Sequence, residues 1–480
     1  MRIPGIILSF FCVVVCSAAA EAQPVWTLER CIQYAREHNI SIRQSELNER
    51  LAALQLQQSR LMQLPNANIG GSGGRSFGRS IDPTSNQFVN TNYNYLGLSG
   101  NADVLLFGWF QKRRQIDQNR MNLEAARHDL DQLQDNVALN VATGYLRAVL
   151  AREQIGVNER QVALSVAQLN QTRRFADAGR VPELDVAQLE SQVATDSANL
   201  IGALAEYNAA ILDLKALLNL DFAEPFEVMP PDVEPEETVR LNELDPEHIY
   251  AAAAAQFGSV KSSQYRVLAA EKGLAAARGA QWPQIGISLQ SGTNYASTFK
   301  EVTGYTLNPG EVQMTGSYVD FNGNQYPVYQ PVIVPQMATT PVADQLRNNF
   351  RQTISLSLSV PLFNSWQAQY NVRRSRIEVL NQMLNREQTE LTLKQDVYKA
   401  YNDAVNSLQK YQAARRAAAA AHRAFDFAQR RYDLGLTNAV EYLTTQNNQY
   451  RADASLASAK YDLIFRLKVI DYYLGKDLKL

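Results

Sequence analysis

In three short stretches of the chain, apolar and polar residues alternate with a period of two, and a fourth stretch is expected to be similar. Residues 354–362 alternate Ile, Leu and Val with serines at positions 355, 357 and 359, and residues 96–106 and 285–290 follow the same rule. Strict alternation gives a β-strand one apolar and one polar face. We therefore predict strands there, and a fourth, Gly-rich strand near residues 69–77 from the repeat described below.

Much longer stretches between these strands have a helical period. Turn and stop residues such as Pro65, Gly179 and Gly435 bound them. At about 1.5 Å per residue the longest helices span on the order of 100 Å and the short ones about 55 Å, so two short helices match one long rod. Apolar stripes such as Leu130–Leu133–Val137–Val141 indicate coiled-coil packing. The predicted helices cover residues 28–64, 111–178, 183–220, 247–281, 365–434 and 438–474.

The chain repeats one unit twice. The phrase "LFGW" at Phe107 returns as "LFNSW" at Phe363, and "AGRVPELDV" at Gly179 returns as "LGLTNAVEYL" at Gly435, both at a spacing of 256 residues. Matched text around Pro65 and Pro283 has a spacing of 218 residues, so the second unit carries 38 more residues before residue 363. We place them in the Gly-, Tyr-, Pro- and Asn-rich stretch 295–346, which predicts a long loop. Its counterpart, about residues 75–92, is short.

The N-terminus has the features of a signal peptide over residues 1–22. Arg2 precedes a short apolar run, and Ala20 and Ala22 form a small-x-small cleavage site, with the alanines at 18–20 as an alternative. Cys16 permits a lipoprotein interpretation, which Val15 disfavours. The domain organisation is then a first repeat over 23–220 (helix, two strands, long helix, helix), a Pro- and Glu-rich linker over 221–246, and a second repeat over 247–480. No apolar run after the signal is long enough for a spanning helix.

Charge and chemistry exclude several function classes. The formal net charge is −2, which argues against a nucleic-acid-binding surface. The four histidines share no metal-ligand spacing, and no catalytic arrangement or phosphate loop is present, so we expect no enzyme activity, metal or cofactor. Cys31 is the one cysteine left after the signal, and we interpret it as an ordinary buried side chain on a helix.

The strands favour a membrane barrel over a half-buried soluble sheet. They are about nine to eleven residues long, as tilted spanning strands are, and their non-apolar faces are small and polar, as in a water-filled lumen. Four strands cannot close a barrel, and open edges are not tolerated in lipid, so several copies must combine. Aromatic residues gather at one end of the strands, where an interfacial girdle belongs: Phe107, Trp109, Phe110, Trp282, Phe363 and Trp366.

Through both repeats, and in opening text such as "TLERCIQYAREHN", the chain resembles the TolC-like outer-membrane efflux protein family. The resemblance implies an α+β membrane protein. A long antiparallel α-helical coiled-coil barrel would continue into a transmembrane β-barrel, with four strands per protomer in a homotrimer. It also implies a location in the outer membrane of a Gram-negative bacterium, with a helical extension into the periplasm. The protein would be an exit duct for drug efflux or type I secretion, docked through a periplasmic adaptor to an inner-membrane pump of the RND or ABC type.

The resemblance also implies roles for the two helix-turn-helix tips. Acidic residues after the second tip would ring the periplasmic entrance; the positions here are Glu441 and Thr444, of which only Glu441 is acidic. Three carboxylates on a symmetry axis attract cations. Asp185 matches an acidic residue that family members carry in the first tip. In the family, a basic residue of the second tip pairs with this acid, but the matching position here is Thr437. Arg180 and Arg431 are the alternative partners for Asp185. The adaptor-docking tips would be Gly179, Arg180, Val181, Gly435 and Leu436.

Two rival functions fit parts of the sequence. A periplasmic coiled-coil scaffold or adaptor would use the same helices and a soluble sheet. A surface-binding protein would use the long loop, around residues 305–329. Cell fractionation distinguishes the scaffold hypothesis from the duct hypothesis, because a periplasmic scaffold is extracted without detergent.

Overall fold

The computed structural model describes residues 26–81, 86–229 and 245–476. The predicted signal peptide and most of the predicted linker lie outside them. The chain divides into two units. The first comprises Met1–Ala52, Asn122–Val267 and Asn381–Leu480, and the second comprises Ala53–Met121 and Leu268–Leu380.

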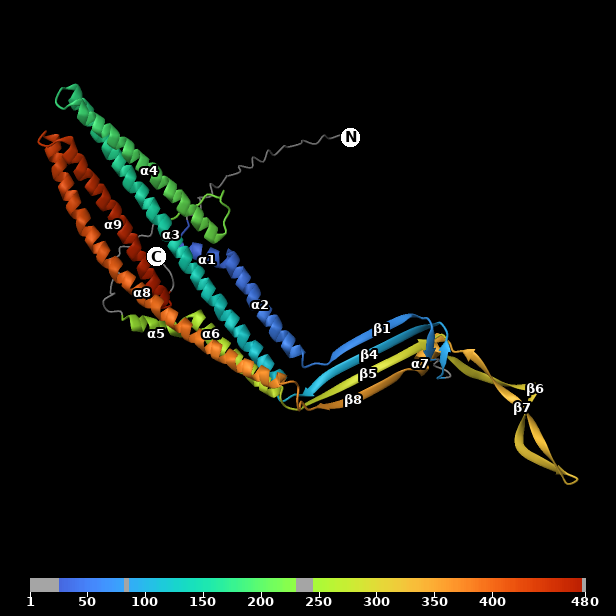
Figure 1. Cartoon of the computed structure of the whole chain (residues 1–480). Helices are drawn as coiled ribbons and strands as arrows, with labels where there is room; N and C mark the ends of the chain where they lie inside the picture. Colours follow the sequence, from blue (N-terminus) through green and yellow to red (C-terminus); the bar gives the residue numbers. More distant parts are fainter. Residues whose placement is uncertain (1–25, 82–85, 230–244, 477–480) are drawn as a thin grey trace, which may run out of the picture. The chain divides into compact units, whose positions relative to one another are not determined.

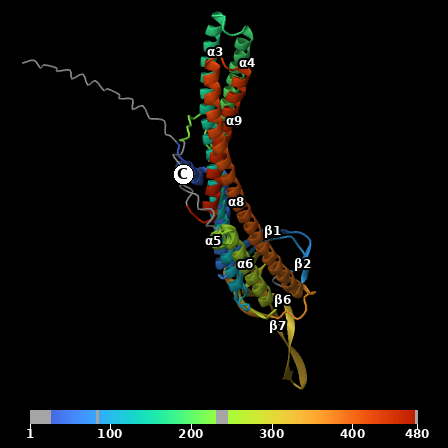
Figure 2. The ribbon, with the colours of Figure 1, turned by 90° about the vertical axis from the view of Figure 1, so that its left-hand side faces the viewer.

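The long helices of the two halves match in length and spacing. Helices α3 (Gln111–Asp177) and α8 (Gln367–Asp433) each contain 67 residues and begin 256 residues apart. Helices α4 (Glu183–Leu218) and α9 (Ala439–Tyr473) follow them after short turns. Within the first unit, the α3–α4 hairpin lies beside the α8–α9 hairpin (Figure 1 and Figure 2). Each half of the chain thus contains a long helix followed by a shorter one.

Two predicted helices are each broken in the structure. Residues 28–64 form α1 (Leu28–His38) and α2 (Ile40–Leu61), and residues 247–281 form α5 (Pro246–Gln256) and α6 (Gly258–Gly279). The breaking residues, Asn39 and Phe257, are both extended and are 218 residues apart, the spacing of the matched prolines.

A local reason for each break is visible. The Asn39 side chain accepts hydrogen bonds from the N–H groups of Ser41 (2.9 Å) and Ile42, and donates to the Leu217 carbonyl at 3.0 Å. It thus caps one helix and ties the chain to α4. In the second repeat, Gly258 leaves no room for a Cβ beside the His128 carbonyl of α3.

The core of the first unit includes part of the predicted linker. Val228 is fully buried and pairs with Trp26 in a parallel bridge. Phe226 stacks on the Trp26 ring at 5.1 Å between centroids. Thr27 caps α1, accepting a hydrogen bond from the Arg30 N–H at 3.3 Å.

The second unit contains a four-stranded antiparallel sheet, as predicted. Its strands are β1 (Asn66–Ser76), β4 (Tyr93–Phe107), β5 (Gln284–Ala296) and β8 (Arg351–Ser359), in the order β1-β4-β5-β8. The first and second repeats thus contribute one pair each. Strands β1 and β8 are the two edges of this sheet.

Register shows that the sheet has one apolar and one polar face. Ile354, Leu356 and Leu358 lie opposite Leu289, Ile287 and Ile285, and the row containing Leu356 continues to Val104. On the other face, Ser355 lies opposite Ser288, which in turn faces Asp103. This confirms the alternation seen in the sequence.

The prediction of an irregular loop over residues 295–346 is wrong. It contains a long β-hairpin, β6 (Lys300–Phe321) and β7 (Asn324–Thr339), followed by α7 (Val342–Asn348). The pairing of β6 with β7 shifts register three times, which hides the alternation in the sequence. The short counterpart loop likewise contains a small hairpin, β2 (Arg79–Ile81) with β3 (Phe88–Asn90).

Among the helices of the described residues, none is both long and apolar enough to cross a membrane.

Candidate functional site

The first helical tip ends α3 in a Schellman motif. Gly179 has a φ of +69°, and its N–H donates to the Ala176 carbonyl at 2.8 Å. The Arg180 N–H donates to the Phe175 carbonyl, also at 2.8 Å. Only glycine adopts this left-handed conformation without steric cost, so the predicted C-cap role is confirmed. Val181 follows in the turn before α4.

The second tip repeats this geometry after α8. Gly435 has a φ of +70°, with its N–H on the Tyr432 carbonyl at 2.9 Å, and the Leu436 N–H donates to the Arg431 carbonyl at 2.8 Å. A Cβ added to either glycine would meet no atom within 4 Å. The glycines are therefore needed for backbone conformation and not for close packing within the chain.

Glu441 is held within its own tip. Its N–H donates to the Asn438 side chain at 2.9 Å, and its carboxylate accepts from Arg431 Nη1 at 3.0 Å and from the Thr437 hydroxyl. Asn438 and Glu441 thus form the start of α9, where the helix dipole favours an acid. Both members of the Arg431–Glu441 pair are about half exposed, at 53% and 51%, so solvent screens their attraction.

The structure does not join Asp185 to any of the predicted partners. Arg431 pairs with Glu441, the Arg180 guanidinium lies 4.6 Å from the centre of the Phe175 ring, and Thr437 bonds to Glu441. No side-chain hydrogen bond or ion pair of Asp185 is found among the described residues. Burial raises the pKa of Tyr432, and the Asp185 charge acts in the same direction.

Thr444 lies one turn further along α9 than the Glu441 brace. Its hydroxyl donates to the Val440 carbonyl at 2.7 Å, four residues back in the same helix. The side chain is thus satisfied locally and carries no charge. Of the two predicted entrance positions on α9, Glu441 and Thr444, only Glu441 is acidic.

Two polar contacts join the two tips to one another. The Thr172 hydroxyl lies 3.3 Å from the Tyr432 hydroxyl, both residues being buried, and Gln171 donates to Asp433 at 3.1 Å. These two contacts link the α3–α4 hairpin to the α8–α9 hairpin within one chain. Within the second hairpin, the Tyr432 ring stacks on Tyr442 at 4.9 Å between centroids.

A buried carboxylate that the sequence analysis missed lies further from the tips. Asp196 is 2% exposed; it accepts from Gln192 at 2.8 Å, from Gln161 at 3.2 Å and from the Ser165 hydroxyl. Gln446 of α9 donates to Ser165 at 3.3 Å, so the network crosses between the hairpins. The signal was a run of polar residues at helical spacing on α3, at positions 158, 161, 165, 168 and 172, together with the i, i+4 pair 192/196 on α4.

The aromatic residues predicted at the membrane interface all lie where strands meet helices. Trp109, after β4, packs on Trp282, before β5, at 4.7 Å between ring centroids. Phe107 contacts both Trp109 and Phe110 at 5.6 and 5.8 Å. The structure thus brings together aromatics from both repeats that are far apart in the sequence.

The second repeat contributes Phe363 and Trp366 at the same place, after β8. Phe363 is 86% exposed, and the Arg373 guanidinium lies 5.0 Å from the centre of the Trp366 ring. At equivalent positions the backbone takes two consecutive left-handed residues, Trp109–Phe110 and Ser365–Trp366. Bulky residues rarely adopt this conformation. The same uncommon turn therefore redirects the chain into a helix in both repeats.

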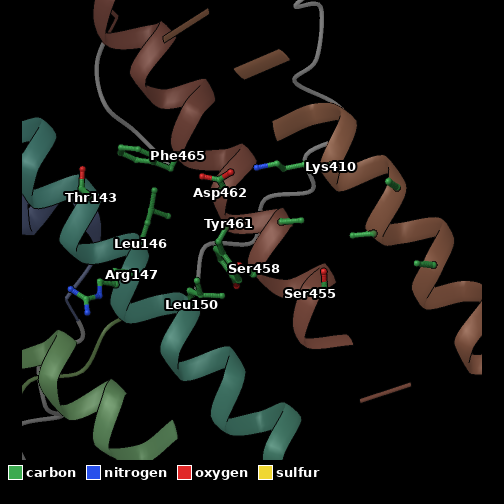
Figure 3. Close-up of a pocket in the computed structure, with 14 residues that line it drawn as sticks. Thr143, Leu146, Arg147, Leu150, Lys410, Ser455, Ser458, Tyr461, Asp462 and Phe465 are labelled. Atoms are coloured by element: carbon green, nitrogen blue, oxygen red, sulfur yellow. The ribbon is translucent and has the colours of Figure 1, made fainter. Parts of the chain in front are cut away.

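The remaining sites offer no chemistry. A groove of about 770 Å³ lies among α3, α8 and α9, lined by apolar side chains such as Leu150 and Phe465, with Lys410 and Asp462 pointing towards one another at its side (Figure 3). Within the described ranges, no group of three or more His, Cys, Asp or Glu side chains is placed to hold a metal ion. Burial raises the pKa of the fully buried Cys31 to about 12, so its thiol is unreactive.

Comparison with known proteins identifies the family. A profile of the "Outer membrane efflux protein" family matches residues 31–220 and 337–475. The chain is 20% identical over 375 residues to outer membrane efflux protein BepC of Brucella suis biovar 1 (strain 1330), covering 78% of this chain and 71% of BepC.

Solved structures show the same fold. CusC, from a study of folding and transmembrane channel formation, superposes with a TM-score of 0.70 at 16% identity, covering 94% of this chain and 92% of CusC. The outer membrane protein VceC of Vibrio cholerae gives a TM-score of 0.70 at 15% identity, covering 94% of this chain and 97% of VceC. As the family profile spans more than half of the chain, the protein belongs to the outer membrane efflux protein family, whose TolC-like members are non-enzymatic transport proteins of the outer membrane.

Proposed function

We propose that the protein is the exit duct of a tripartite efflux or type I secretion system. Three copies pair their four-stranded sheets into one 12-strand barrel in the outer membrane, and their helices form a tunnel in the periplasm. Substrates pass from an inner-membrane pump and its periplasmic adaptor to the exterior without further chemistry. Members of this family work with such adaptors and pumps, which supports the assignment of partners.

The observation that carries this proposal is the uncovered sheet. Every residue of β8 is exposed, including Ile354, Leu356 and Leu358 at 73, 72 and 67%. A half-buried soluble sheet would bury this apolar face against another element of the chain. Here its apolar side chains need a hydrocarbon environment, and its polar face suits a water-filled lumen.

The two sheet edges supply the reason for oligomerisation. Strands β1 and β8 each pair on one side only. In a bilayer an unpaired backbone N–H or C=O has no water to bond to, so open edges are not tolerated. Pairing β8 of one copy with β1 of the next closes the barrel and satisfies both edges. A soluble scaffold has no such need.

The aromatic cluster and the helical tips take their roles from this arrangement. Phe107, Trp109, Trp282 and Trp366 belong at the boundary between lipid and water, where aromatic girdles lie. The tips around Gly179 and Gly435 then lie at the periplasmic end, where the adaptor docks, and Asp185 and Glu441 contribute negative charge to the entrance.

A matched pair of variants tests the proposal. Leu356→Arg places a charge on the apolar face and costs about 2–4 kcal/mol per chain in lipid, whereas Ser357→Arg, its neighbour on the polar face, is tolerated. We expect Leu356→Arg alone to lose the outer-membrane fraction, the heat-modifiable oligomer on gels, and conductance in planar bilayers. Wild-type protein that is soluble in the periplasm, or equal behaviour of the two variants, would contradict the duct.

A further inference from the structure

The β6–β7 hairpin has one continuous apolar face. Its register places Tyr305 opposite Pro335, Leu307 opposite Ile333, Val312 opposite Pro331 and Met314 opposite Tyr329. All these residues lie on one face, because side chains two positions apart on a strand share a face. The apolar face is exposed: Tyr305, Leu307, Val312, Tyr329, Ile333 and Met337 are between 51 and 73% accessible.

The opposite face of the hairpin is mixed. Gln313 lies opposite Gln330 and Gly304 opposite Gln336, but Val319 lies opposite Tyr326, and Val332 and Val334 lie opposite Asn308 and Thr306. The hairpin therefore has one continuous apolar face and one face on which polar and apolar residues alternate. An exposed contiguous apolar patch of this kind marks an interaction surface.

Prolines determine how this surface can be used. Pro327, Pro331 and Pro335 are spaced by four residues along β7 and so lie on the same face. Because proline has no N–H, β7 is poorly suited to accept a further strand along its free edge. A partner strand is therefore not expected to extend the ladder at β7, which leaves the apolar face as the contact surface on this side of the hairpin.

The root of the hairpin is fixed to the sheet. Gln345 of α7 is 1% exposed, donates to the carbonyls of Ala296 (3.1 Å) and Thr340 (2.8 Å), and accepts from the Ala296 N–H at 3.0 Å. Through Gln345, these hydrogen bonds connect the end of β5 to the residue that follows β7. The hairpin thus begins at a defined place between β5 and the edge strand β8.

Two other environments suit the apolar face poorly. Hydrocarbon is excluded because a two-stranded ribbon has two open backbone edges. An anionic membrane surface is disfavoured because the hairpin carries three acids, Glu301, Glu311 and Asp320, against one base, Lys300. In water alone, an isolated two-stranded hairpin is marginally stable.

We propose that the apolar faces of three β6–β7 hairpins pack against one another around the trimer axis, outside the membrane, and narrow the exit of the duct. The occupant of each face is thus a second copy of this chain. This inference rests on the proposed trimer, whose rotational symmetry brings three identical faces to the same height. The mutual contact buries the exposed Tyr, Ile and Met side chains and the non-polar proline rings.

Single cysteines on opposite faces of β7 test the contact. Tyr329→Cys lies in the apolar face, and Gln330→Cys, one residue away and also exposed, lies in the other face and is the control. Both are made in a Cys31→Ser background and treated, as purified oligomer in detergent, with a short bis-maleimide. We expect crosslinked dimers in denaturing gels at several-fold higher yield from Tyr329→Cys than from Gln330→Cys.

The failures of the two proposals can be distinguished. If the heat-modifiable oligomer is present and the two positions crosslink equally, or neither does, the hairpin contact is overturned while the duct stands. If no oligomer forms, the proposed function itself fails. A maleimide that cannot cross membranes gives a second readout: protection of Tyr329→Cys in detergent supports contact between copies. If Tyr329→Cys is protected from the maleimide only in lipopolysaccharide vesicles, the apolar face binds the membrane surface, and the proposed contact between copies is overturned.

Discussion

The two helical tips have the same backbone and different side-chain chemistry. Gly179 and Gly435 have φ angles of +69° and +70° and equivalent hydrogen bonds. In the second tip, Arg431 and Thr437 hold Glu441. At the equivalent positions 256 residues earlier, the first tip has Phe175 and Val181, so its acid, Asp185, has neither partner. Duplication has thus preserved the turn, and divergence has braced only one of the two acids.

The same contrast continues along the hairpins. The buried network of Gln161, Ser165 and Asp196 belongs to the first repeat, and the equivalent residues of the second repeat are Ala417, Ala421 and Ala452. A buried polar network fixes the register of packed helices, whereas alanines permit close approach without specifying it. The first hairpin therefore carries the polar contacts that align it with α9, through Gln446.

The largest effect is expected from breaking the polar network of the first repeat. Asp196→Ala leaves the buried Gln161 and Ser165 donors without their carboxylate acceptor and costs about 3 kcal/mol. Asp453→Ala is the control, because it removes only the partly exposed pair with His422 (2.8 Å), worth about 1 kcal/mol or less. Thermal melting of the purified protein by circular dichroism measures both. Equal losses would mean that the Asp196 network does not stabilise the hairpins.

The second-largest effect is expected from replacing the glycine that each tip uses for its turn. Gly179→Ala and Gly435→Ala each force a Cβ into the left-handed region and cost about 1–2 kcal/mol, by similar amounts in the two tips. Hydrogen exchange of the last turns of α3 and α8 should increase in each variant. A large cost at one tip alone would show that the shared turn geometry is not what the glycines provide.

The smallest effect is expected from changing the acidic residues of the two tips, which differ in their partners. Asp185→Asn should reduce cation selectivity in planar bilayers more than Glu441→Gln does, because Arg431 already offsets the Glu441 charge. The double variant Arg431→Phe with Thr437→Val, which gives the second tip the residues of the first, should raise cation selectivity while costing about 0.5 kcal/mol in stability. Unchanged selectivity in all three would remove both acids from the pore entrance.

Much of the fold could be predicted because its signals are local or repeated. Gly179, Gly435 and the prolines mark the helix ends, and the alternating serines of β8 reveal its two faces. The breaks at Asn39 and Phe257 could not be predicted, because the Asn39 side chain replaces a lost helical bond with a contact to Leu217, far away in the sequence. The β6–β7 hairpin was missed because three register shifts interrupt its alternation.

The site was less predictable than the fold. The candidate residues Glu441, Thr437 and Arg431 came from the family resemblance, but which of them bond depends on side-chain rotamers around the five-residue turn 434–438. The Asp196 network joins residues from three helices, and no spacing in a single segment reveals such a contact. Buried polar residues at i, i+4 on two adjacent helices are the signal to search for in related chains.

The central claim is that the edges of the sheet pair across copies. Amide hydrogen exchange of the purified oligomer, read by mass spectrometry, tests it most directly, because paired backbone N–H groups exchange slowly. We predict that the amides of the edge strands β1 and β8 are protected as strongly as those of the central strands β4 and β5. Rapid exchange confined to β1 and β8 would show open edges and would contradict the barrel.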